Sequence, residues 1–273
     1  MLRMMLTCHP DINIPPESHW FLWLHERYKQ WRPSEGIDAF LDDLFACTKI
    51  ETWELDRTDL QLAISREAPA NYSDLVSLVY QQYGKKHGAA GSRWGDKNSL
   101  WIEKIPTILE CFPNAQLIHL VRDGRDVACS YLELGAKTMD SKYAPKLPQT
   151  IREIAEIWMR NVEYVQQFGK DLGPDQYQEC KYENLLNDAT TSIQRMTEFL
   201  DLPYDDRMVD YHKSDANASL EPKDFMQWKP KLMEPIDQSN SGKYLHELSN
   251  AEIAEFQQIA GDTLRKYGYP IHE

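Results

Sequence analysis

Hydrophobic side chains recur along much of the chain at the spacing of an α-helix. Ile37, Phe40, Leu41, Leu44 and Phe45 follow the order i, i+3, i+4, i+7, i+8, which places them on one face of a helix. The same period predicts four further helices. One begins at 75–79, and the other three lie at 150–168, 191–200 and 249–268. The last of these opens with Ser and Glu in capping-box spacing and stops near a glycine, as helices commonly do.

Strands are predicted at three places, each followed by a helix: residues 93–94, 116–122 and 176–182. Such alternation is typical of a parallel sheet with helices on its faces. We therefore expect an α/β fold with three layers, a helix-rich single domain over residues 1–273. In open sheets of this kind, ligands bind beyond the carboxyl ends of the strands.

Polar residues gather where the second predicted strand ends, in the sequence LVRDGRDVACS. Arg122 ends the strand, Gly124 permits a tight turn, and Asp126 could cap the helix that carries Ser130. An arginine fork, a hydroxyl and the amides of a helix N-terminus suit a phosphate. The simpler interpretation, in which the two Arg–Asp pairs of the turn neutralise each other at the surface, is equally open.

A lysine follows the first predicted strand, in the sequence RWGDKNSLW. Lys97 could hold a transferring anionic group as a mobile point charge. It could equally be a solvated loop residue.

Composition narrows the classes of function. A formal net charge of −13 over 273 residues argues against general nucleic-acid binding, although residues 85–125 hold seven basic against four acidic side chains. No apolar run is long enough to span a membrane. Five dispersed cysteines without a CxxC pattern favour reduced thiols and a cytoplasmic location over disulfides or a metal site.

The two motif-bearing segments together, GDKNSLWIEKIPTILECFPNAQLIHLVRDGRDVACSY, resemble the middle of the sulfotransferases that use 3′-phosphoadenylyl sulfate. The similarity is closest to the branch of tyrosylprotein sulfotransferases and their bacterial relatives. Three further segments resemble other parts of that family in the right order: LRMMLTCHPDINIPPESHW, CKYENLLNDATTSIQRMTEFLDLPYDD and SNSGKYLHELSNAEIAEFQQIAGDTLRKYGY. The resemblance implies the sulfotransferase fold, related to that of P-loop kinases, and transfer of sulfate to an acceptor hydroxyl or amine.

The resemblance also assigns nucleotide-binding roles. Arg122 and Ser130 would bind the 3′-phosphate, which Lys243 would reach from a loop near the C-terminus. Tyr182, in the sequence KYE, would lie near the adenosine. Tyr182 could instead be a core tyrosine with a bonded hydroxyl, and Lys243 an exposed loop residue.

The catalytic roles implied by the resemblance fall on Lys97 and Glu17. Lys97 would stabilise charge on the bridging oxygen as the sulfuryl group leaves, and Glu17, in the sequence PPES, would accept the proton of the acceptor. Glu17 could instead simply favour a helix N-terminus. His19 is the second choice as base, because its ordinary pKa suits proton transfer. The mechanism requires no metal.

One feature of the family is not found in the given sequence. The family's first strand and its Pro-(Arg/Lys)-Ser-Gly-Thr-Thr loop, which cradles the 5′-phosphosulfate, would precede Leu2. We therefore expect an N-terminally incomplete domain whose transfer activity is impaired. Two alternatives remain open: a non-catalytic descendant that still binds the nucleotide, and a kinase of related fold, which would need a Walker-type loop that the sequence lacks.

Overall fold

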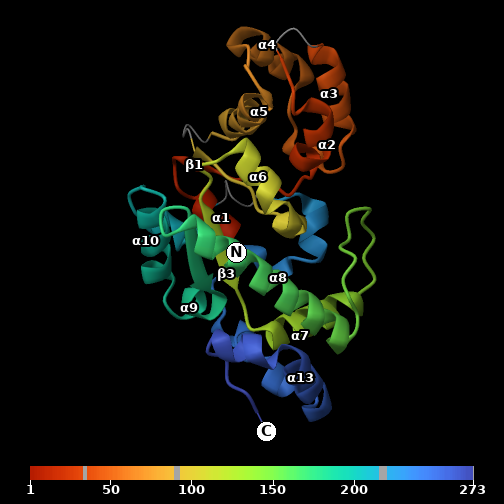
Figure 1. Cartoon of the computed structure of the whole chain (residues 1–273), viewed down its shortest axis with the longest axis vertical. Helices are drawn as coiled ribbons and strands as arrows, with labels where there is room; N and C mark the ends of the chain where they lie inside the picture. The colour runs from red at the N-terminus through yellow and green to blue at the C-terminus, as the bar shows by residue number, and fades with distance from the viewer. Residues whose placement is uncertain (33–35, 89–92, 215–219, 273) are drawn as a thin grey trace. The chain divides into compact units, whose positions relative to one another are not determined.

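The computed structural model describes residues 1–32, 36–88, 93–214 and 220–272 (Figure 1). The chain forms two compact units. Unit 1 comprises residues 1–115, 205–226 and 231–233, and unit 2 comprises residues 116–204, 227–230 and 234–273.

Unit 1 is mainly helical and has an aromatic core. Its α-helices are α1 (Leu2–Thr7), α2 (Trp20–Tyr28), α3 (Ile37–Ala46), α4 (Arg57–Glu67), α5 (Tyr72–Lys86) and α6 (Ile105–Cys111). The rings of Trp20, Trp53 and Tyr80 pack against one another at the centre of the core. The apolar stripe predicted from residue 37 onward lies on α3, where Phe40, Leu41 and Leu44 are fully buried.

Two very short strands of unit 1 pair in parallel. β1 (Ile12–Asn13) lies beside β2 (Arg93–Trp94), with Ile12 opposite Arg93. The ladder continues for one further bond, from the Gly95 amide to the Asn13 carbonyl at 2.9 Å. The sequence predicted β2 but not β1, because two residues are too few to show a period.

Unit 2 is built on a longer parallel pair. β3 (Leu117–Val121) and β4 (Tyr177–Lys181) pair over five residues, with Leu117 opposite Tyr177 and Val121 opposite Lys181. The helices of the unit are α7 (Gly124–Gly135), α8 (Ile151–Leu172), α9 (Tyr182–Asn187), α10 (Ala189–Phe199), α12 (Tyr244–Glu247) and α13 (Asn250–Lys266). The parallel direction agrees with the prediction.

Helices cover both faces of this pair of strands. Side chains alternate between the two faces of a strand, so successive residues contact different helices. On one face, Tyr177 packs over Gly169 of α8, where an added Cβ would come within 2.4 Å of the ring, and Glu179 accepts a hydrogen bond from Tyr267 at the end of α13. On the other face, Gln178 donates to the Arg195 carbonyl of α10. The expected α/β class and its three layers are thus confirmed in unit 2.

The helix predictions from periodicity are confirmed with small shifts at the ends. The capping box predicted for the last helix is present: Ser249 and Glu252 exchange hydrogen bonds at the start of α13. Gly268, just past this helix, has φ +67°, a conformation that favours glycine. The expectation of a single domain over residues 1–273 stays a prediction.

Candidate functional site

The turn after β3 in unit 2 differs in detail from its prediction. Asp123, and not Asp126, caps α7, by accepting the Arg125 amide at 2.9 Å. Gly124 does not need a positive φ; an added Cβ there would come within 2.5 Å of the rings of Trp158 and Phe256. Close packing of an aromatic layer against the helix start is therefore the reason for this glycine.

Arg122 is the centre of the predicted nucleotide-binding residues. Its Nη1 donates to Ser130 Oγ at 3.1 Å, and its guanidinium carbon lies 4.9 Å from the centre of the Tyr182 ring. Its Nη2 donates to the carbonyl of Asn240 at 2.7 Å. The structure thus brings together three of the predicted residues, of which Arg122 and Ser130 are close in the sequence and Tyr182 is distant.

The Nε donor of this guanidinium shows whether an anion would fit. Arg122 Nε is buried and has no hydrogen-bond partner within the described part of the chain. An enclosed N–H without an acceptor is costly, and an oxygen of a phosphate group would satisfy it with a charge-assisted bond. The residues at this turn therefore fit an anionic ligand.

Lys243 lies at the start of α12 and is mostly buried, with 12% of its side chain exposed. Its Nζ is 3.3 Å from Glu247 Oε2 and 3.9 Å from Glu133 Oε2. Both glutamates are about half exposed. Ion pairs with exposed partners contribute little, so the Lys243 ammonium can exchange them for another anion.

Asp126, which was predicted to cap α7, instead binds the segment that carries Lys243. Its side chain is fully buried and accepts the amides of Gly242 at 2.7 Å and Tyr244 at 3.0 Å. Burial raises the pKa of Asp126, and the two amide bonds oppose that rise. Sequence reasoning missed this contact because more than a hundred residues separate the partners and no local pattern signals it.

Arg125 was likewise not predicted as a structural centre. It is fully buried and forms an ion pair with Asp123, with 2.7 Å between Nη2 and Oδ2. Its Nη1 donates to Gln257 Oε1 and to the carbonyl of Pro270, and its guanidinium carbon lies 3.9 Å from the centre of the Tyr244 ring. One of the two Arg–Asp pairs expected at the turn thus exists, but in the core and not at the surface.

The predicted catalytic pair lies in unit 1. Lys97, which follows β2 and is 55% exposed, donates to Glu17 Oε1. A second lysine, which the sequence did not single out, lies on the other oxygen, with 3.6 Å between Lys49 Nζ and Glu17 Oε2. Glu17 is thereby held between two ammonium groups.

Backbone contacts fix the position of Glu17. The carbonyl of Pro16 accepts Trp53 Nε1 at 2.9 Å, and the carbonyl of Ser18 accepts Asn98 Nδ2 at 3.2 Å. The Ser18 hydroxyl donates to the carbonyl of Thr48 at 3.2 Å. The residues on both sides of Glu17 are therefore tied to the loops that carry its two lysines.

Two further titratable residues, His19 and Asp96, are neighbours of the Lys97–Glu17 pair. His19 is buried, and neither ring nitrogen has a partner among the residues that the structure describes; burial, and then Lys49, lower its pKa. Burial raises the pKa of Asp96 to about 8. Near neutral pH the Asp96 carboxyl is largely protonated, so it does not offset the charge of the adjacent Lys97.

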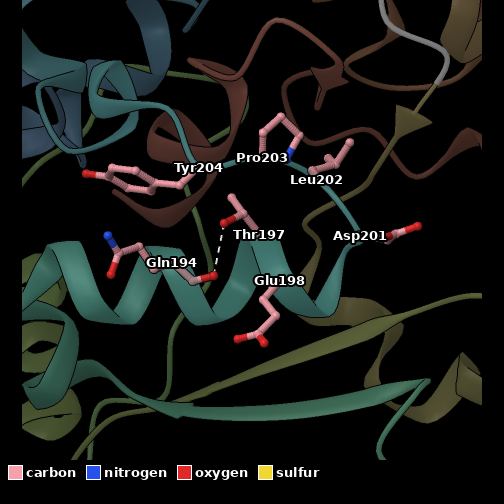
Figure 2. A pocket seen from close by; sticks show the side chains of 7 residues that line it. All are labelled: Gln194, Thr197, Glu198, Asp201, Leu202, Pro203 and Tyr204. Carbon is pink, nitrogen blue, oxygen red and sulfur yellow. Dashed lines mark hydrogen bonds between the residues drawn. The ribbon is translucent and has the colours of Figure 1, made fainter.

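An open hollow beside α10, of about 510 Å³, is a different kind of surface (Figure 2). Its charged lining residues are Glu198 and Asp201, and among the described residues no basic side chain lines it. Two carboxylates repel an anion, so this hollow is unsuited to a nucleotide phosphate.

The described ranges contain neither a candidate metal site nor a candidate membrane span. Within them, no three or more His, Cys, Asp and Glu side chains gather in a way that could hold a metal ion. No helix there is both long and apolar enough to cross a membrane.

Two solved structures have a fold similar to that of this chain. The sulfotransferase domain of the Synechococcus PCC 7002 olefin synthase superposes with a TM-score of 0.62 at 19% identity, over 99% of this chain and 90% of that domain. The sulfotransferase domain of the curacin biosynthetic pathway gives 0.60 at 20% identity, over 99% and 93%. At this identity the likeness shows a shared fold, as the resemblance implied.

Sequence comparison establishes the family. Residues 1–206 match the sulfotransferase family, so the chain belongs to it. The match includes Glu17, Lys97, Arg122, Ser130 and Tyr182, whereas Lys243 lies outside it.

Curated relatives are named protein-tyrosine sulfotransferases. That of Drosophila melanogaster is 21% identical over 78% of this chain, and protein-tyrosine sulfotransferase A of Caenorhabditis elegans is 21% identical over 98%. A putative one from Caenorhabditis briggsae is 28% identical over 78%. The aligned parts make up 38%, 63% and 65% of these relatives' own length.

Proposed function

We propose that this chain transfers a sulfuryl group from 3′-phosphoadenylyl sulfate to an acceptor hydroxyl or amine. The observation that carries the proposal is the environment of Arg122. A basic fork, a serine hydroxyl and an aromatic ring converge at the end of a parallel strand, and one buried N–H of the fork has no acceptor among the described residues. Family membership supplies the class of donor.

In unit 2, Arg122 and Ser130 bind the 3′-phosphate, and Lys243 adds a second positive charge. Tyr182 lies against the adenosine. The Arg122 guanidinium makes the strongest contact, because it offers several donors in a fixed plane. Tyr182 limits the motion of the fork by packing against it.

In unit 1, Glu17 accepts the proton of the acceptor as its oxygen or nitrogen forms a bond to sulfur. The bond between sulfur and the bridging phosphate oxygen breaks, and Lys97 stabilises the negative charge that develops on that oxygen. The adjacent Asp96 carboxyl, mostly neutral near pH 7 because burial raises its pKa to about 8, adds little negative charge beside Lys97.

A protein tyrosine is the first acceptor to test, because the curated relatives carry that name. The expectation that turnover by this chain is impaired stays a prediction, which the transfer rate tests. A cytoplasmic location likewise stays a proposal from the cysteine pattern.

The nucleotide part is tested by a thermal-shift titration with adenosine 3′,5′-bisphosphate, on the parent chain and on Arg122→Ala. Ligand at a hundredfold excess over its Kd should stabilise the parent by about 2.7 kcal/mol, and the variant should lose that shift. A parent that shows no shift would contradict the proposed donor.

The transfer step is tested with labelled 3′-phosphoadenylyl sulfate and a tyrosine-containing peptide. Glu17→Gln and Lys97→Met should each reduce the transfer rate by about a hundredfold or more while keeping the thermal shift with the bisphosphate. If the parent binds the nucleotide but transfers to no hydroxyl or amine acceptor, the non-catalytic alternative replaces the enzyme.

A further inference from the structure

The buried carboxylate of Asp126 has no role in the chemistry described above, although it lies one helical turn before Ser130. Burying a carboxylate away from water is costly unless its oxygens are hydrogen-bonded. Asp126 Oδ2 accepts the amide of Gly242 and Oδ1 accepts the amide of Tyr244. Both bonds are charge-assisted, and their donors are the amides on either side of Lys243.

The segment around Lys243 is hydrogen-bonded at every second residue. Arg122 Nη2 binds the carbonyl of Asn240 at 2.7 Å, and Asp126 binds the next two alternate positions, Gly242 and Tyr244. Gly242 has φ +73°, a conformation that a residue with a Cβ adopts at a cost. The backbone that presents Lys243 is therefore fixed to the start of α7 at three points.

The side-chain contacts of Lys243 do not fix it in the same way. Its partners Glu133 and Glu247 have 56% and 47% of their side chains exposed. Pairs of this kind are weak and exchange with other anions. The location of the ammonium therefore depends mainly on the backbone anchor that Asp126 supplies.

We propose that Asp126 is a positioning residue for 3′-phosphate recognition. Its buried carboxylate brackets Lys243 by binding both flanking amides, and thereby holds the Lys243 ammonium where the 3′-phosphate binds. The inference rests on the proposed nucleotide-binding role of unit 2. Its specific consequence is that the preference for a nucleotide with a 3′-phosphate depends on a residue that does not touch that phosphate.

The readout is the ratio of the Kd values for adenosine 5′-monophosphate and adenosine 3′,5′-bisphosphate, measured by calorimetry on the full chain. Asp126→Asn places an amide NH₂ against one backbone N–H and so breaks one half of the bracket. We expect this ratio to fall by about tenfold, with little change in the Kd for the monophosphate. A residue that only supports the fold would weaken both nucleotides alike.

A double-mutant cycle shows whether the effect passes through the lysine. Lys243→Met should reduce the ratio by a similar factor, and Asp126→Asn combined with Lys243→Met should reduce it no further. Asp262→Asn, which makes the same chemical change at a fully exposed position of α13, should leave the ratio unchanged.

If Asp126→Asn does not fold, a second variant tests the same segment. Gly242→Ala strains the bracketed turn and leaves the carboxylate in place, and we expect the same loss of ratio. Its control is Gly173→Ala, at a glycine with φ +77° and open space around the missing Cβ, which likewise forces a Cβ onto a positive-φ position elsewhere in unit 2. This control should keep the ratio.

The outcomes separate the inference from the proposed function. A parent that prefers the bisphosphate, and keeps that preference in Asp126→Asn and Gly242→Ala, overturns the positioning role alone. Additive losses in the double mutant also overturn it. A parent without any preference overturns the 3′-phosphate site itself, and the positioning role with it.

Discussion

The candidate residues of the two units are held by different means. In unit 2, Arg125 and Asp126 are fully buried, and each has hydrogen bonds to segments that follow much later in the chain. In unit 1, Lys97 is 55% exposed and meets Glu17 on short loops. The buried pair at the start of α7 in unit 2 is therefore part of the core, whereas Lys97 in unit 1 is open to solvent.

The burial of a charged group determines which kind of loss its substitution should cause. Removing one member of a buried charge pair leaves its partner unpaired in a low-dielectric region, which destabilises the fold. Removing an exposed member of an ion pair changes stability little. We therefore expect substitution of the buried Arg125 in unit 2 to act first on folding, and substitution of the exposed Lys97 in unit 1 to act first on the reaction.

The largest expected effect is that of Arg125→Met. The change leaves Asp123 unpaired and removes the donors to Gln257 and Pro270, so the free energy of unfolding should fall by about 3–5 kcal/mol. Urea denaturation measures it. Lys97→Met, the matched substitution in unit 1, should stay within about 1 kcal/mol of the parent. Equal losses in the two variants would remove the distinction between the units.

Gly124→Ala should have the second largest effect. The new methyl group meets the rings of Trp158 and Phe256 at 2.5 Å, and such overpacking typically costs about 1–3 kcal/mol. Chemical denaturation again gives the value. Gly261→Ala on α13, where an added Cβ meets only a side-chain nitrogen at 3.7 Å, should instead stabilise by up to about 1 kcal/mol. A Gly124→Ala variant as stable as the parent would show that the rings of Trp158 and Phe256 rearrange at little cost.

Helix caps should give the smallest effect, and an equal one in the two units. Ser249 caps α13 in unit 2, and Asn71 caps α5 in unit 1 by accepting the Asp74 amide at 2.9 Å. Replacing either by alanine should cost about 1 kcal/mol. A large difference between Ser249→Ala and Asn71→Ala in thermal unfolding would mean that the units differ in local stability as well as in their charged groups.

Much of the fold was accessible from local patterns. The apolar stripe of α3, the capping box of α13 and the strand β3 are each set within a few residues, by a period or a cap that neighbours along the chain supply. The parallel direction of β3 and β4 followed from the helices between them. The strand β1 was missed because its two residues show no period.

The candidate site was only partly accessible. Arg122 could be placed at a strand end, and Ser130 lies on the next helix, so their meeting followed from local structure. The cap of α7 was predicted at Asp126 and is formed by Asp123, because two acidic residues near a helix start are hard to tell apart in the sequence. Lys49 was missed altogether; its contact with Glu17 joins loops whose paths the sequence does not specify.

Residue types and short spacings were sufficient to predict the family and the α/β class, and to nominate the candidate site residues. The tertiary structure alone decided which charges are buried and which backbone each one holds. Asp126 binds the amides beside Lys243 only because the chain returns to the start of α7 more than a hundred residues later. A buried carboxylate needs donors, and only the folded chain determines which ones reach it.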